Sequence, residues 1–245
     1  TWRIFFGSMT SFFTLDMVLS VYRGIPGQLS NGGLLNFGNF DDATYAVWEM
    51  PLFLLMGALG GVLGALFNHV NYKLTVFRMR YITARPLKML EAAIVAAVTA
   101  SAGFLMIYLM DDCKPYGNGP TPNPIQMYCD DGEYNVIGAI WFQTPEQSVR
   151  SLFHDPPGSH QLSTLGVFFI IYFFLNCWTY GLSVSSGVFI PTLLTGAAWG
   201  RFIGTAMLNL FPDHELSDPG KYALLGAAAM LGGVTRMTIS LTVIL

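Results

Sequence analysis

A glycine and a proline interrupt one of the most apolar parts of the chain, in the stretch "SGVFIP". The first backbone amides of a helix have no partner within it, and inside a bilayer such groups must face protein, water or a ligand. Gly187 offers flexibility, and Pro191 in the first turn removes no needed hydrogen bond. The pattern therefore predicts a helix that begins within the membrane, with the amides of Val188, Phe189 and Ile190 available to a ligand.

The chemistry of this helix start favours an anion. The positive end of the helix dipole lies there, and the segment 183–194 contains no Lys or Arg. Partial charges on amides bind an anion weakly enough to release it during transport. The alternative is a buried loop–helix junction capped by Ser185 or Ser186, and the residues alone leave both open.

The composition is that of an integral membrane protein. Of the 245 residues 53% are hydrophobic and 11% charged, with a mean hydropathy of +0.49, whereas soluble domains average about 25% charged residues. The net charge of −3, without a basic run among aromatics, excludes a nucleic-acid surface. No nucleophile–base pair or paired carboxylates mark an intramembrane enzyme.

Apolar segments of about 20 residues predict the membrane spans. The predicted helical segments are 2–22, 46–70, 87–110, 163–182, the broken 188–211, and the shorter 221–233 and 234–245. Both ends of the chain are apolar, so we expect an interior piece of a longer protein.

Charge predicts the orientation of these spans. Five of the twelve basic residues lie between the second and third spans with no acid among them, namely Lys73, Arg78, Arg80, Arg85 and Lys88. This connection should be cytosolic. The acidic region 111–162 should then face the lumen or the outside, and the helix start at Val188 should lie at or below the middle of the bilayer.

Small residues recur at the spacing that lets helices approach closely. Three faces have this spacing: Gly57/Gly61/Ala65, Gly60/Gly64 and Gly196/Gly200/Gly204. We expect each to pack against a neighbouring helix.

Cys113 and Cys129 share the acidic region, whereas Cys177 lies in a predicted span. A Cys113–Cys129 disulfide and two separate thiols are both compatible with the sequence. The cysteine spacing and the scattered histidines predict no metal site.

Four ionisable residues in or near the spans need an interpretation. Asp16 and Glu91 are interpreted as packing or interfacial residues rather than proton carriers. Arg201 and Arg236 are expected to bind backbone carbonyls or to extend towards the membrane surface. The stretch "FHDPPGSH" is interpreted as a rigid turn rather than a His–Asp pair.

Several blocks of the sequence resemble one family of membrane proteins. "SSGVFIP" is similar to the G-x-F-x-P signature of the CLC chloride channels and chloride–proton exchangers. "CWTYGLSVSSGVFIPTLLTGAAWGR", "SLFHDPPGS", "DPGKYALLGAAA" and "GGVTRMTISLTVI" resemble its lysosomal exchanger branch, as do "TWRIFF" and "NYKLTVFRMRYI". The resemblance covers essentially the whole chain.

The resemblance implies an all-α integral membrane fold: a CLC-type inverted-repeat helical bundle with broken helices, incomplete in this chain. Residues 1–245 would form part of the transmembrane domain, the last helix of its first half and most of its second. The amides of Val188 and Phe189 would bind chloride, with Gly187, Ile190 and Pro191 completing the motif. The gating and proton-transfer glutamates and the cytosolic nucleotide-binding domains would lie outside the chain.

The function implied is chloride–proton antiport across the lysosomal or late endosomal membrane, by a multi-pass homodimer embedded in lipid. The alternative is a passive voltage-gated chloride channel of the same family. No Asn-x-Ser/Thr sequon occurs, and the resemblance implies a glycosylated single-pass partner subunit. Chloride and protons are the expected transported ions, and no cofactor, metal or nucleic acid is expected in this chain.

Overall fold

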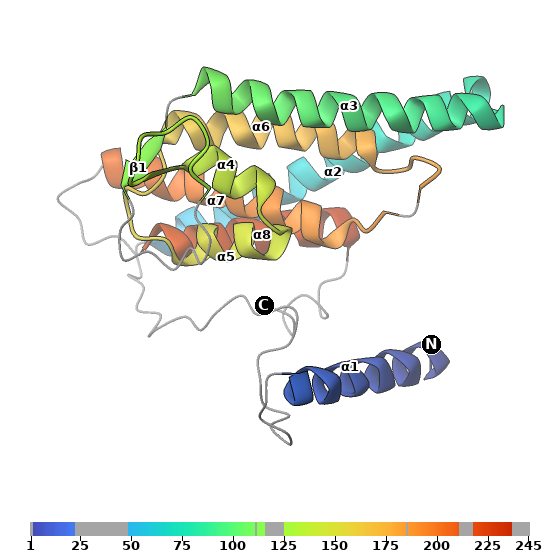
Figure 1. Cartoon of the computed structure of the whole chain (residues 1–245), viewed down its shortest axis with the longest axis horizontal. Coiled ribbons are helices and arrows are strands. Elements are labelled where there is room, and N and C mark those ends of the chain that lie inside the picture. The colour runs from blue at the N-terminus through green and yellow to red at the C-terminus, as the bar shows by residue number, and fades with distance from the viewer. Residues whose placement is uncertain are drawn as a thin grey trace. The chain divides into compact units, whose positions relative to one another are not determined.

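The computed structural model describes residues 2–22, 49–110, 112–115, 125–184, 186–210 and 218–236. The chain divides into two units, Thr1–Asn36 and Phe37–Leu245, which are treated separately. In the first unit α1 (Trp2–Tyr22) is one continuous helix over the predicted range (Figure 1). Apolar side chains are exposed along it, among them Phe6, Phe13 and Val21.

The second unit is a helical bundle with one small sheet (Figure 1). Its elements are α2 (Met50–Tyr81), α3 (Arg85–Leu109), β1 (Cys113–Pro115), β2 (Glu133–Asn135), α4 (Val136–Phe142), α5 (Pro145–His154), α6 (Leu162–Thr179), α7 (Phe189–Leu210) and α8 (Pro219–Thr235). The strands pair antiparallel, with Cys113 opposite Asn135. The predicted helical fold is confirmed, and the sheet and the short helices α4 and α5 are additions to it.

Proline in the first turn marks the start of α2, α3, α5 and α8. Its fixed φ suits a helix, and its missing N–H costs no helical hydrogen bond there. Helix α4 begins differently, because the side chain of Asn135 accepts a hydrogen bond from the amide of Gly138 at 2.9 Å. Local sequence thus sets most helix starts in this unit.

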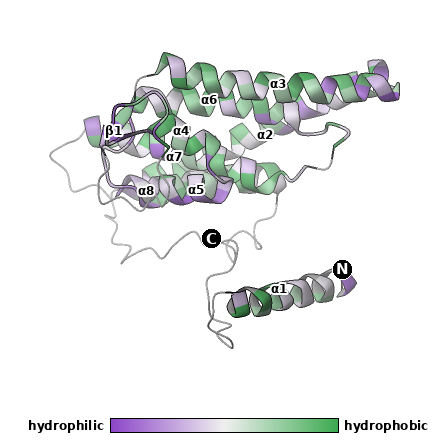
Figure 2. Cartoon of the chain, viewed as in Figure 1, coloured by the Kyte–Doolittle hydropathy of each residue, from purple (hydrophilic) through white to green (hydrophobic). Residues whose placement is uncertain are grey.

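Three helices of the described residues, α2, α3 and α6, are long and apolar enough to cross a membrane. Figure 2 shows hydrophobic colour along α3 and α6. Their ranges agree with the predicted spans at every end but one. Helix α2 does not stop near residue 70 but continues through the basic segment to Tyr81, so the connection to α3 is only residues 82–84. The basic residues that we placed in a loop therefore lie mostly on helix ends.

Glycine lets α7 approach α8 at backbone distance. A Cβ atom added at Gly200 would lie 2.1 Å from the carbonyl oxygen of Tyr222, and one added at Gly196 would lie 2.7 Å from that of Gly226. The predicted packing role of this face is confirmed.

Among the described residues, only one of the two small-residue faces of α2 packs closely against another helix. A Cβ atom added at Gly60 would lie 2.5 Å from the Cβ of Ala229, and one added at Gly64 would lie 2.4 Å from the backbone of Gly233. At Gly57 and Gly61 such an atom would meet nothing within 4 Å. Helix α8 is thus held between α2 and α7.

The main core lies where α4 to α8 meet. It buries aliphatic and aromatic side chains from each of these helices, including Ile137, Leu152, Phe168, Leu193 and Ala227. The start of α7 enters this core directly, which fixes its position relative to α5, α6 and α8.

A disulfide joins Cys113 of β1 to Cys129, with their Cα atoms 5.8 Å apart. Cys177, in α6, is free and buried. Of the two arrangements left open by the sequence, the structure has the bonded one.

Candidate functional site

The candidate site is the break between α6 and α7. Helix α6 ends at Thr179 and α7 begins at Phe189. The first backbone hydrogen bond of α7 runs from the amide of Thr192 to the carbonyl of Val188, at 3.2 Å. The amides of Val188, Phe189 and Ile190 therefore precede the first bond of the helix, as the sequence predicts.

Two threonine side chains fix the first turn of α7. The hydroxyl of Thr192 donates to the carbonyls of Val188 at 2.7 Å and Phe189 at 2.9 Å. That of Thr195 donates to the carbonyl of Pro191 at 2.6 Å. Sequence reasoning missed both residues, although each threonine lies four residues after the carbonyl that it binds, and this spacing is the available signal.

The side chains at the helix start point into two different clusters. Val188 packs against the cluster of Phe67, Phe173, Cys177, Met230 and Val234. Phe189 packs against the main core between α4 and α8. Because both side chains are anchored by packing, the orientation of the two backbone amides is set by α2, α6 and α8.

The glycine that bends the break is Gly181, whose φ is +89°. Gly187 is exposed, and a Cβ added there would meet nothing within 4 Å. Packing among the described residues therefore does not require glycine at position 187. Ser186 is exposed, and Ser185 lies outside the described residues, so the capping alternative stays a hypothesis.

The ionisable residues near the spans have structural partners. Glu91 forms an ion pair with the Nε of Arg78 at 2.6 Å, in agreement with a packing role. Arg201 is 1% exposed and donates to the carbonyls of Leu152 at 2.5 Å and Asp155 at 2.7 Å, as predicted. Arg236 is the exposed C-cap of α8, and the side chain of Asp16 lies outside the described residues.

The turn after α5 gathers further polar groups. Asp155 accepts a hydrogen bond from the hydroxyl of Ser151 at 2.6 Å and lies 3.8 Å from His160. Burial raises the pKa of Asp155 above its usual 3.8. Burial, followed by the charges of Arg201 and Lys114, holds the pKa of His160 well below 6.5. The predicted turn is present, and it brings Asp155 beside His160 of the following segment.

Metal chemistry has no support among the described residues, which contain no group of three or more His, Cys, Asp or Glu side chains able to hold an ion. The arrangement that remains is a helix start with oriented amides, which suits reversible binding of a small anion.

A bundle with three membrane-length helices and a helix that starts beside such a break is typical of polytopic transport proteins. Comparison with known families agrees: the voltage gated chloride channel family model matches residues 1–245. The chain belongs to this family. As the sequence indicates, this is a family of membrane channels and transporters rather than of enzymes.

Among curated relatives, the chain is 58% identical over its whole length to the human (Homo sapiens) H(+)/Cl(-) exchange transporter 7. It is 33% identical over 99% of its length to chloride channel protein CLC-b of Arabidopsis thaliana. It covers 31% of the human relative and 32% of the plant one, so it spans about a third of their length. The crystal structure of a eukaryotic CLC transporter matches 82% of this chain and 29% of its own, with a TM-score of 0.52 and 28% identity.

Proposed function

We propose that the chain is part of a chloride–proton exchanger and that the amides of Val188 and Phe189 bind the chloride. The observation that carries the proposal is the start of α7, whose first amides precede the helical hydrogen bonds and whose side chains are anchored by packing. The 58% identity to an H(+)/Cl(-) exchange transporter supports proton coupling over passive conduction.

The wider context belongs to the same proposal. Residues 1–245 form part of the transmembrane domain of a homodimer in the lysosomal or late endosomal membrane, associated with a glycosylated single-pass subunit. Nucleotide binds in cytosolic domains outside this chain. The basis is the resemblance to the exchanger branch and the 31% share of the relative that the chain covers.

The anion site is tested by removing one amide donor from the full-length protein. Phe189→Pro deletes the N–H at the first helical position, where proline is tolerated. Phe189→Leu keeps the amide and most of the apolar contact. A lost hydrogen bond to a charged ligand is worth about 1.5–3 kcal/mol, so we expect chloride affinity by titration calorimetry to fall at least about tenfold in the proline variant alone. Equal affinity in both variants contradicts the site.

Proton coupling is tested in liposomes. An imposed proton gradient should drive chloride uphill if the protein is an exchanger. Chloride flux that never responds to the gradient identifies the passive channel instead.

A further inference from the structure

Side chains of α2 hold the end of α6 immediately before the break. The guanidinium of Arg78 donates to the carbonyls of Trp178 at 2.5 Å and Tyr180 at 3.0 Å. The amide of Asn71, two turns earlier on the same helix, donates to the carbonyl of Tyr180 at 3.1 Å. The last carbonyls of a helix have no partner within it, so α2 supplies partners for those of α6.

The guanidinium is itself oriented by α3. Its Nε donates to Glu91 at 2.6 Å, which leaves the two Nη groups to the carbonyls of α6. Arg78 is 8% exposed, so its charge is held inside the protein beside an opposite charge. A lysine could not reproduce this arrangement, because its donors radiate from one atom rather than from a planar fork.

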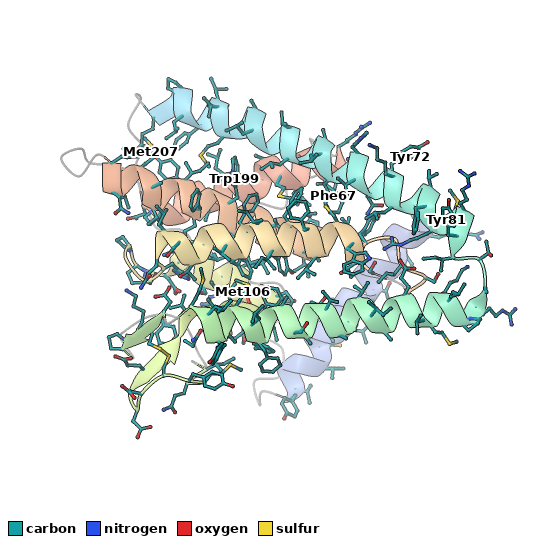
Figure 3. The ribbon with its side chains drawn as sticks, turned by 90° about the horizontal axis from the view of Figure 1, so that it is seen from above. Phe67, Tyr72, Tyr81, Met106, Trp199 and Met207 are labelled. Atoms are coloured by element: carbon teal, nitrogen blue, oxygen red, sulfur yellow. A yellow bond between two sulfur atoms is a disulfide. The ribbon has the colours of Figure 1, made fainter. Side chains whose placement is uncertain are left out.

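The break between α6 and α7 lies directly against Asn71 and Arg78. Gly181 has a φ of +89°, and a Cβ added there would lie 3.1 Å from the Nη1 of Arg78. Past the turn, Val188 returns to α2 by packing in the cluster that contains Phe67. Figure 3 shows Phe67 on the side of α2 that faces α6. Both ends of the break therefore rest on α2, with Asn71 and Arg78 at one end and Phe67 at the other.

We propose that Asn71 and Arg78, with Glu91, are positioning residues for the anion site: they fix the turn at Tyr180–Gly181 and thereby the placement of the Val188 and Phe189 amides. The inference rests on the proposed function. We assign these side chains no direct contact with chloride, since each nitrogen of Arg78 and the amide of Asn71 already donates to a carbonyl or to Glu91. Their loss changes the anion site through the backbone.

Helix α2 offers a matched control for Asn71. Asn68 has the same side chain on the same helix, and its amide donates at 3.2 Å to the carbonyl of Val234, at the end of α8. Asn68→Leu and Asn71→Leu each remove an amide that binds the end of a neighbouring helix. Only Asn71 binds the end that leads into the break.

The experiment compares these variants, with Arg78→Lys, in the full-length protein purified as the folded species. Chloride affinity is measured by titration calorimetry, the chloride-to-nitrate flux ratio in liposomes, and Tm by differential scanning fluorimetry. We expect Asn71→Leu and Arg78→Lys to lower chloride affinity about tenfold, the effect of misaligning one charge-assisted hydrogen bond, and to reduce the preference for chloride. Asn68→Leu should lower Tm while changing affinity and flux ratio much less than Asn71→Leu does.

Two results overturn the inference: unchanged affinity in Asn71→Leu and Arg78→Lys, or an equal loss in Asn68→Leu. If Phe189→Pro has no effect on chloride binding, the proposed anion site has failed instead. The positioning role then fails because there is no anion site at α7, whatever the Asn71 and Asn68 variants show.

Discussion

Arg78 and Arg201 are both buried, and each binds the carbonyls that end a neighbouring helix. Arg78 of α2 holds the end of α6 and donates its Nε to Glu91. Arg201 of α7 holds the end of α5 through the carbonyls of Leu152, Asp155 and Pro156. Its Nε has no hydrogen-bond partner in the part of the chain that the structure describes.

The comparison shows two ways to accommodate a buried guanidinium. At α6 a carboxylate neutralises the charge directly. At α5 the carbonyls, which carry the negative end of the helix dipole, accept the hydrogen bonds of the guanidinium, and the charge of Asp155 acts on it without a hydrogen bond. The carboxylate of Asp155 accepts from Ser151 and lies beside His160, so the α5 end has a histidine–carboxylate pair where the α6 end has an arginine–carboxylate pair.

The largest expected effect is the loss of Arg201. Arg201→Leu leaves several buried carbonyls unpaired and should cost about 3–5 kcal/mol of unfolding free energy, read as a lowered Tm of the full-length protein. Arg150→Leu, at an exposed position of α5, is the control and should change Tm little. Equal Tm losses would contradict the role of the α5 carbonyls.

The second prediction concerns the disulfide between Cys113 of β1 and Cys129. The bond between Cys113 and Cys129 closes a segment with a sequence separation of 16, so replacing both by serine should cost about 3 kcal/mol. Hydrogen exchange of the β2 and α4 amides should accelerate. Alkylation of both cysteines without reductant, detected by mass spectrometry, would refute the bond.

The third prediction compares the loss of charge at Glu91, beside the α6 end, with the loss of charge at Asp155, beside the α5 end. Glu91→Gln removes the opposite charge from a buried guanidinium and should cost about 2 kcal/mol. Asp155→Asn keeps the hydrogen bond from Ser151 and should cost less than about 1 kcal/mol, because burial already disfavours the charged form and raises the pKa of Asp155. Chemical denaturation compares the two, and a larger cost for Asp155→Asn would reverse the comparison.

The last predicted effect is a pH dependence at the α5 end. His160 has a pKa well below the 6.5 of an unfolded chain, so the unfolded state binds more protons below that pH and stability falls as the pH falls. The loss should be about 1.4 kcal/mol between pH 7.5 and 5.5. The raised pKa of Asp155 acts with the opposite sign, because the folded state then binds the extra proton.

The measurement is local hydrogen exchange of α5 across this pH range. In His160→Gln the exchange rates, corrected for their intrinsic pH dependence, should become less dependent on pH. An unchanged profile would assign the titration to another group.

Local patterns predicted the helices and the start of α7 well, because Pro191 and the apolar runs act over a few residues. They could not identify which small-residue face of α2 packs. Gly60 and Gly61 are adjacent in sequence, and the choice depends on Ala229 and Gly233 of a distant helix.

The same limit applies to the candidate site. The amides of Val188 and Phe189 follow from the rules of helix starts. Arg78, in contrast, was placed with a basic loop, because its partner Trp178 is 100 residues away. Only Glu91, 13 residues away, was within reach of a local argument.

The sequence separations of Arg78 from Trp178 and from Glu91 also predict the order in which its contacts form during synthesis. At a synthesis rate of about 5–20 residues per second, the 100 residues between Arg78 and Trp178 take about 5–20 seconds to translate. Through that interval the guanidinium must enter the nascent bundle without the carbonyls that it finally binds. Glu91 emerges almost at once, so an α2–α3 hairpin in which the charge of Arg78 is already paired can insert before α6 is made.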